Sequence, residues 1–184
     1  AVMHHTQAFG LGFDEVDALT GPKIGRPKSA TYRTADVVGL DTLAHVVKTM
    51  QDTLPGDPWH TYFAAPAWLA GLIAQGALGQ KTRGGIFKKQ GKEIQVLDVA
   101  QQGYRTSAGA VADDVAAILK MKNPAEKFAQ LRASQHPQAQ FLWAMFRDLF
   151  HYSAYHLASI ADTAASTGTD GWQTAMTWTF PPST

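Results

Sequence analysis

Apolar residues recur along much of the chain at the three- and four-residue spacing of a helix with one buried face. The clearest stripe consists of Val37, Leu40, Ala44 and Val47. It predicts a helix from about Ala35 to Met50. Gly39 would lie inside this helix, where glycine permits close packing with a neighbour at a cost of up to ~1 kcal/mol relative to alanine.

Start and stop signals extend the helical pattern to most of the chain. Asp14 is placed to cap a short helix that Gly21 and Pro22 end, and Asn123 caps another that has proline at its first position. We expect helices over 1–11, 14–19, 59–63, 66–73, 113–119, 124–132 and 137–165. The last is apolar on more than one face, which is typical of a helix buried on two sides.

One stretch has strand character instead. Residues 86–88 and 94–97 are apolar-rich segments on either side of a polar turn over 89–93 that contains Gly91. This pattern predicts a β-hairpin, which must lie on the helices because an isolated hairpin is marginally stable. Residues 100–109 read as a polar linker. The expected fold class is therefore mainly α, with one β-hairpin.

Composition limits the classes of function. The 184 residues suit one domain, or one domain and a small second piece, and they include no cysteine. This excludes disulfides, thiolate zinc sites and a cysteine nucleophile, and it fits a reducing compartment. The net charge of +1 implies no nucleic-acid partner. No apolar run is long enough to span a membrane, and the first residues do not form a secretory signal.

Charged residues make up only 17% of the chain, below the usual quarter. Such a low fraction predicts that part of the surface is buried against a partner or another domain.

The titratable residues form no recognisable catalytic motif. The chain has no dinucleotide fingerprint, no P-loop and no Gly-x-Ser-x-Gly elbow. The carboxylates of Asp14, Glu15 and Asp17 are expected to be solvated and to stabilise a helix end by their charge. Asp36 and Asp41 look similar, although Asp41 could cap a helix or pair with an arginine.

Two histidines and two tyrosines cluster on the last helix: His151, Tyr152, Tyr155 and His156. The two histidines are five residues apart and lack a third ligand nearby, so hydrogen bonding is favoured over metal binding. Asp148 and Asp162 are the expected partners.

Basic residues gather in two loops. The first group is Arg26, Lys28 and Arg33, and the second, around the hairpin, is Lys81, Arg83, Lys88, Lys89 and Lys92. Each group is either ordinary solvated charge or an anion site. A binder of CoA or of another anion is therefore one alternative function, and a CoA titration with Lys81→Ala and Arg83→Ala variants would test it.

Three segments resemble the C-terminal domain of bacterial L-3-hydroxyacyl-CoA dehydrogenases. They are DEVDALTGP from Asp14, IGRPKSATYRTADVVGLDT from Ile24 and LGQKTRGGIFK from Leu78. The second is similar to the family's Gly-Pro-Phe turn followed by Asp-x-x-Gly-Leu-Asp, with Ala30, Thr31 and Tyr32 in place of Gly-Pro-Phe. It matches a subgroup often fused to an enoyl-CoA hydratase. The third is similar to the family's Gly-x-Lys-Thr-Gly turn into a hairpin.

This resemblance implies a helical bundle of the 6-phosphogluconate dehydrogenase C-terminal-like type. It also implies a cytoplasmic parent enzyme that oxidises 3-hydroxyacyl-CoA with NAD in fatty-acid β-oxidation. The family's NAD-binding domain and catalytic residues would precede Ala1, so no catalytic residue is assigned, and we expect this chain to bind no NAD and no metal. Its expected contribution is a homodimer or interdomain interface and a wall of the acyl pocket, formed by Ser29, Ala30 and Tyr32.

The same resemblance divides the chain in two. Residues 1–107 are expected to be a first copy of the C-terminal domain, and residues 108–184 a helical extension that begins a second copy. The first helix lacks a capping residue, which predicts a fragment without its NAD-binding domain. The alternative from another class is a free-standing helical interaction module without enzymatic activity.

Overall fold

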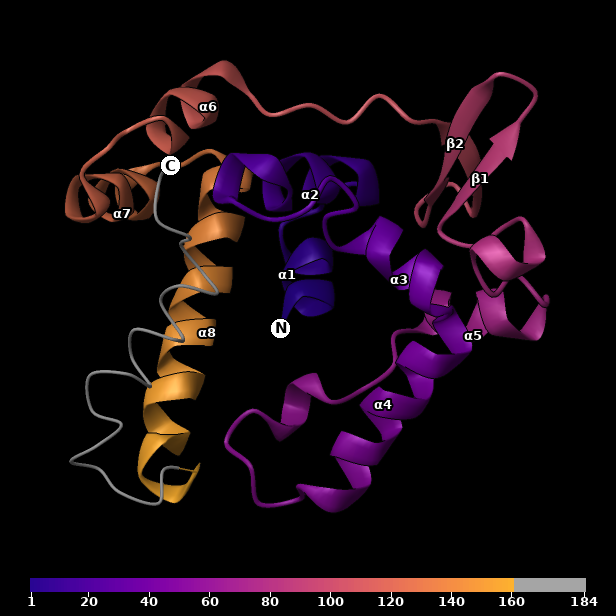
Figure 1. Ribbon diagram of the computed structural model, residues 1–184, viewed down its shortest axis with the longest axis horizontal. Coiled ribbons are helices and arrows are strands. Elements are labelled where there is room, and N and C mark those ends of the chain that lie inside the picture. The colour runs from indigo at the N-terminus through magenta and orange to yellow at the C-terminus, as the bar shows by residue number, and fades with distance from the viewer. Residues whose placement is uncertain (161–184) are drawn as a thin grey trace.

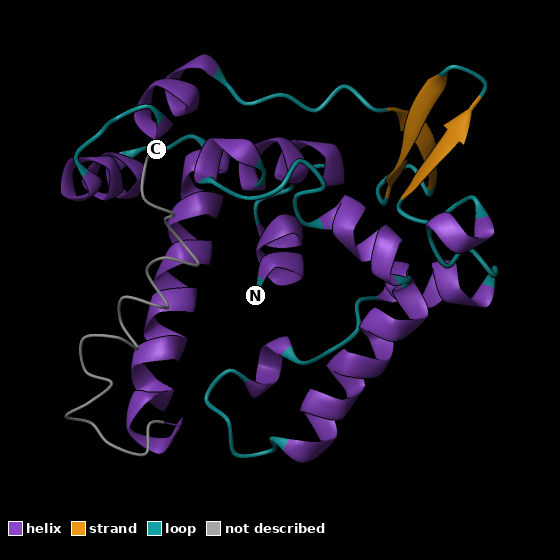
Figure 2. Cartoon of the chain, in the orientation of Figure 1, coloured by secondary structure: helices purple, strands orange, loops and turns teal. Residues whose placement is uncertain are grey.

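The computed structural model describes residues 1–160, with side chains to residue 156. The fold is mainly helical, with one small antiparallel sheet, as the sequence predicts (Figures 1 and 2). The helices are α1 (Val2–Ala8), α2 (Phe13–Thr20), α3 (Tyr32–Val38), α4 (Leu40–Thr53), α5 (Ala67–Ala74), α6 (Asp113–Leu119), α7 (Pro124–Ala133) and α8 (Pro137–Ile160). Single turns of 3₁₀ helix lie at Pro22–Ile24, His60–Tyr62 and Gln80–Thr82.

The sheet contains three strands, β1 (Phe87–Gln90), β2 (Glu93–Asp98) and β3 (Gly103–Thr106), in the order β1-β2-β3. The expected hairpin is confirmed by the pairing of Phe87 with Val96. The expectation of a linker over 100–109 is wrong in part, because residues 103–106 pair with β2 in antiparallel register. Tyr104 and Arg105 are amphipathic, and their alternation over four residues is too short to distinguish from a polar loop.

The predicted helix from Ala35 to Met50 is interrupted at Gly39. This residue has φ +105° and ψ +130°, a conformation essentially restricted to glycine, and it separates α3 from α4. Of the predicted stripe, Leu40 and Val47 are buried, whereas Val37 is 57% exposed. A continuous helix was the wrong expectation because glycine here serves as a bend.

A single hydrophobic core joins the two ends of the described chain. Phe13, Leu19 and Tyr32 from the first third of the chain pack in one cluster with Phe141 and Phe146 of α8. In Figure 1, α8 stands on one side of the molecule and α4 on the other, with α1 between them and α2 across one end. The sheet lies beyond α3, on the side away from α8. The proposed boundary at residues 107 and 108 stays a prediction.

Two helix starts illustrate how the sequence sets the elements. Asn123 accepts hydrogen bonds from the backbone N–H groups of Ala125 and Glu126, so it caps α7 as expected. Asp14 does not cap α2, because the N-cap is Gly12 and Asp14 is the second residue of the helix. Glu15 accepts from Gly12 N–H at 2.9 Å and so performs part of the capping role. The end of the segment 108–184, which was expected to begin a second copy, lies outside the described residues.

Candidate functional site

The loop between α2 and α3 is held by one buried carboxylate. Asp17 on α2 accepts hydrogen bonds from the backbone N–H groups of Thr31, Tyr32 and Arg33, at 3.1, 2.6 and 2.9 Å. These are donors at the start of α3, which a helix leaves unsatisfied, so Asp17 acts as a cap from a distant position. Burial raises the pKa of Asp17 to about 6, while the N–H donors oppose that rise.

This loop carries the three residues expected to form a substrate wall. Ser29 and Ala30 are half-buried, and Ala30 has φ +47°. Tyr32 is only 1% exposed, and its hydroxyl lies 2.7 Å from the Thr6 hydroxyl. Its ring packs edge-on to Phe13, with 4.6 Å between centroids. Ser29 and Ala30 therefore reach the surface, and Tyr32 anchors their loop in the core.

A second buried carboxylate joins α3 to the sheet. Asp36 is 4% exposed and accepts from the N–H groups of Ile86 and Phe87, at 2.9 and 2.7 Å. Burial raises the pKa of Asp36. Gly79 and Gly85 lie so close to Asp36 that a Cβ at either position would clash with its atoms. These contacts give the Gly-rich segment after α5 a physical reason for its glycines.

A third carboxylate binds the sheet to α2. Asp14 receives two hydrogen bonds from the Arg105 guanidinium, at 2.8 and 2.7 Å, and one from Ala108 N–H. Burial of Asp14 disfavours its charge, but these hydrogen bonds prevail and lower the pKa of the carboxyl. The expectation that Asp14, Asp17 and Asp36 are solvated is therefore wrong. Their partners lie 14 to 94 residues away in sequence, and no local pattern reveals them.

The predicted ion pair of Asp41 exists, but with a lysine. Lys81 Nζ lies 2.7 Å from both carboxylate oxygens of Asp41, at a partly exposed position. The charge of Lys81 is thus balanced by Asp41, and Lys81 does not line the groove formed by other basic residues near the hairpin.

Two members of the cluster on α8, Tyr152 and His156, make hydrogen bonds as expected, but with a different partner. His156 Nε2 lies 2.9 Å from Asp57 Oδ2, and the Tyr152 hydroxyl donates to the same oxygen at 3.2 Å. Asp148 instead lies 2.6 Å from His5 on α1, and Asp162 is outside the described residues. The expectation that Asp148 partners the cluster is wrong because α8 turns that residue towards α1. Asp57, in the loop after α4, had no signal beyond its position before a proline.

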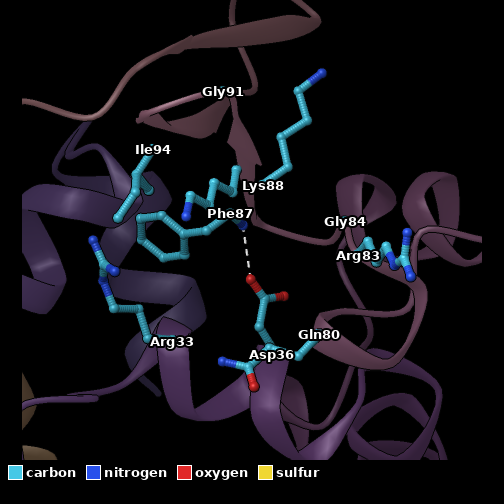
Figure 3. A pocket seen from close by; sticks show the side chains of 10 residues that line it. Arg33, Asp36, Gln80, Arg83, Gly84, Phe87, Lys88, Gly91 and Ile94 are labelled. Atoms are coloured by element: carbon cyan, nitrogen blue, oxygen red, sulfur yellow. Dashed lines mark hydrogen bonds between the residues drawn. The ribbon is translucent and has the colours of Figure 1, made fainter.

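Some of the basic loop residues converge on a groove of about 530 Å³ (Figure 3). Arg33, Arg83, Lys88 and Lys89 line it, together with Asp36 and Phe87. Arg26 and Lys28 do not line it. Among the residues that the structure describes, no group of three His, Asp or Glu side chains could hold a metal ion, and none of the helices is long and apolar enough to cross a membrane.

The fold and this geometry define a mainly helical domain whose loops are fixed by buried carboxylates and which carries one cationic groove. Comparison with known proteins gives the family. Residues 3–89 match the family model for the 3-hydroxyacyl-CoA dehydrogenase C-terminal domain, and over these residues the chain belongs to that family. The match contains Asp14, Asp17, Asp36 and the turn into β1.

Curated relatives agree with this family. The chain is 38% identical over 153 residues to a "Probable 3-hydroxyacyl-CoA dehydrogenase" of Bacillus subtilis. This alignment covers 83% of the chain and 19% of the relative. It is 41% identical over 87 residues to a protein of the same name from Deinococcus radiodurans, covering 47% of this chain and 24% of the relative. The chain thus spans about a fifth to a quarter of these relatives. No solved structure matches it with significance.

Proposed function

We propose that this chain is the substrate-side and dimerisation region of an NAD-dependent 3-hydroxyacyl-CoA dehydrogenase that acts in fatty-acid β-oxidation in the cytoplasm. The observation that carries the proposal is the family match over residues 3–89. The Bacillus subtilis relative supports it, because an alignment of 153 residues extends beyond the family match into the region of α6–α8.

In this proposal the chemistry belongs to residues outside the chain. The sequence has no dinucleotide fingerprint, and the named relatives are several times longer than the part they share with it. We therefore expect the 184 residues to form no catalytic NAD site and to have no activity by themselves.

The test compares the isolated chain with the protein encoded by the complete reading frame that contains it. We expect the longer protein to reduce acetoacetyl-CoA with NADH, and the purified 184-residue chain to show no turnover. Turnover by the isolated chain would contradict the proposal, as would inactivity of the longer protein towards every 3-hydroxyacyl-CoA offered.

Ser29 and Ala30 remain the proposed wall of the acyl pocket, and Tyr32, which is 1% exposed, would support that wall from the core. Their loop is supported from behind by Asp17 and the core, so a bulky side chain at Ser29 would project from a fixed position. In the longer enzyme, Ser29→Leu should raise KM for long acyl chains more than for short ones and leave KM for NAD unchanged. Lys28→Leu, at the exposed neighbouring position, is the control. Equal effects on all chain lengths would argue against the wall.

A further inference from the structure

The groove beside the hairpin has the size of a small-molecule site. It lies where α3, the loop over 79–85 and the β1–β2 hairpin meet (Figure 3). Its volume of about 530 Å³ falls within the range of roughly 300–1,000 Å³ found for ligand pockets. It is therefore larger than a single inorganic anion requires.

The groove carries an excess of positive charge. Four cationic side chains, Arg33, Arg83, Lys88 and Lys89, and one carboxylate, Asp36, line it, which leaves three net positive charges. Within the described residues no ion pair joins any of these four cations to a carboxylate, whereas nearby Lys81 is paired with Asp41. A concave surface with one sign of charge concentrates ions of the opposite sign.

Asp36 forms no ion pair with these cations in the described residues, although its charge interacts with that of Arg33. One of its oxygens accepts from Ile86 N–H and the other from Phe87 N–H, so the carboxylate is directed at the backbone of the hairpin. Lys88 has a separate contact, because its Nζ lies 3.8 Å from the centroid of the Tyr104 ring. Arg83 and Lys89, both exposed, are the cations most available to a ligand.

One side of the groove is flat and apolar. Lys89 pairs with Ile94 across the hairpin, and Phe87 lies two residues from Lys89, so Phe87 and Ile94 share a face of the sheet. The Arg33 guanidinium lies 4.6 Å from the centroid of the Phe87 ring. Figure 3 shows Arg33, Phe87 and Ile94 together on one side and Arg83 on the other.

The backbone around the groove is already fixed. Gly79 N–H donates to Gly84 O at 2.9 Å, Gly84 N–H returns a bond to Gly79 O at 3.1 Å, and Arg83 has φ +59° in this closed loop. On the opposite side, Arg33 N–H is bonded to Asp17. A ligand would therefore bind without the cost of ordering these loops.

We propose that this groove binds a small organic phosphate. Arg83 and Lys89 would contact the phosphate oxygens, and a planar apolar group would lie against Arg33, Phe87 and Ile94. A phosphate suits the site better than a carboxylate, because it carries more charge and accepts from several directions. The proposal does not depend on the dehydrogenase role, since it concerns only binding by the chain described here.

The test is calorimetric titration of the full 184-residue chain with three probes: ADP, which has both parts of the ligand, inorganic pyrophosphate and adenosine. We expect ADP to bind more tightly than either of the others, and its affinity to fall as salt is raised. Absence of ADP binding would overturn the proposal. If pyrophosphate binds as tightly as ADP, the proposed contact of a planar group with the apolar side of the groove is wrong.

Variants locate the site. Arg83→Gln and Lys89→Gln should each weaken ADP binding by about tenfold, the usual effect of losing a hydrogen bond to a charged group. Lys92→Gln is the matched control, because Lys92 is an exposed cation of the same hairpin that does not line the groove. Ile94→Thr should weaken ADP binding but leave pyrophosphate binding unchanged.

Two further results would contradict the assignment. If Lys92→Gln weakens ADP binding as much as Lys89→Gln, the attraction is diffuse surface charge and not this groove. If Arg83→Gln and Lys89→Gln bind ADP like the unaltered chain, the groove is not the site. A thermal melt of each variant establishes that it is folded, so loss of binding reports on the ligand contact.

Discussion

Asp14, Asp17 and Asp36 show how single side chains hold this molecule together. Each is buried, and each accepts hydrogen bonds from backbone N–H groups of a distant segment. Such an acceptor is costly to alter. Once it is removed, the N–H donors have no hydrogen-bond partner and little access to water. These residues therefore offer the sharpest tests of the fold.

Asp17→Asn should lower the free energy of unfolding at pH 7 by about 1–3 kcal/mol. The amide has one acceptor oxygen in place of two, so an N–H of the first turn of α3 loses its partner and faces another donor. Urea denaturation provides the measurement. Asp52→Asn is the control, because its carboxylate is 55% exposed and pairs only with Lys48 on the same helix. Similar losses in the two variants would show that Asp17 is not a cap.

The pH dependence of stability should also reveal Asp17. Its pKa of about 6 in the folded protein lies above the ~3.9 of an unfolded aspartate. The folded state therefore holds the proton more tightly, and this stabilisation is complete below about pH 4 and is lost as the pH rises through 6. The shift corresponds to at most about 3 kcal/mol.

Asp17→Asn cannot titrate, so the difference in unfolding free energy between the unaltered protein and this variant isolates the contribution. We expect that difference to shrink between pH 4 and pH 7 in urea titrations. A difference that grows with pH would mean that the three N–H donors outweigh burial and hold the carboxylate charged.

At the scale of elements, the helices were largely predictable, and the breaks between them were not. Hydrophobic spacing and the Asn123 cap locate α6, α7 and α8 because those signals are local. The division at Gly39 coincides with a contact to a distant segment, because Leu40 N–H donates to Leu78 O at 3.1 Å. Strand β3 was missed for the same reason, since only its pairing with β2 makes it a strand. The sequence indicates two basic loops that could bind an anion. It does not show which of their cations line the groove.

Gly39→Ala tests the bend. A Cβ at φ +105° is strained and would lie 2.8 Å from Asp41 Oδ1, so we expect a loss of about 1–3 kcal/mol in unfolding free energy. Gly71→Ala is the contrasting control. Gly71 lies inside α5 with open space around its Cα, and alanine there should stabilise the helix by up to ~1 kcal/mol. If Gly39→Ala is as stable as the unaltered protein, the result favours a continuous helix over a bend at this residue.

At the scale of the whole molecule, the sheet is joined to the helices by few polar links. Arg105 of β3 reaches Asp14 of α2 across 91 residues of sequence, and its side chain is 32% exposed. Arg105→Ala would leave the Asp14 carboxylate buried without its guanidinium. Because the pair is partly solvated, we expect a loss of about 1–3 kcal/mol, less than for a fully buried pair.

Urea denaturation again measures the effect, with Lys120→Ala as the control at an exposed cation. A loss of less than about 0.5 kcal/mol, the ordinary size of a surface effect, would show that the pair of Arg105 with Asp14 does not hold the sheet to α2.

The proposed dimer belongs to this scale as well. Three valines on α3 and α4 are largely exposed: Val37 at 57%, Val38 at 55% and Val46 at 50%. Exposed apolar side chains that lie together are typical of a protein–protein interface. If these side chains lie in a dimer interface, Val37→Asp should raise the dissociation constant at least about tenfold in sedimentation equilibrium. Val99→Asp, at a 43% exposed valine after the sheet, should not. A chain that is monomeric at every concentration would contradict dimerisation.

The contact between His5 and Asp148 has a consequence for the time at which the molecule can fold. The two residues are 143 positions apart and lie in the first and last helices of the described chain. A ribosome that adds ~5–20 residues per second makes the second of them on the order of ten seconds after the first. During that interval Met3 and Phe9 of α1, which pack against the finished core, have no α8 to cover them. The nascent chain therefore exposes this apolar surface, and the aggregation hazard that goes with it, until α8 has been made.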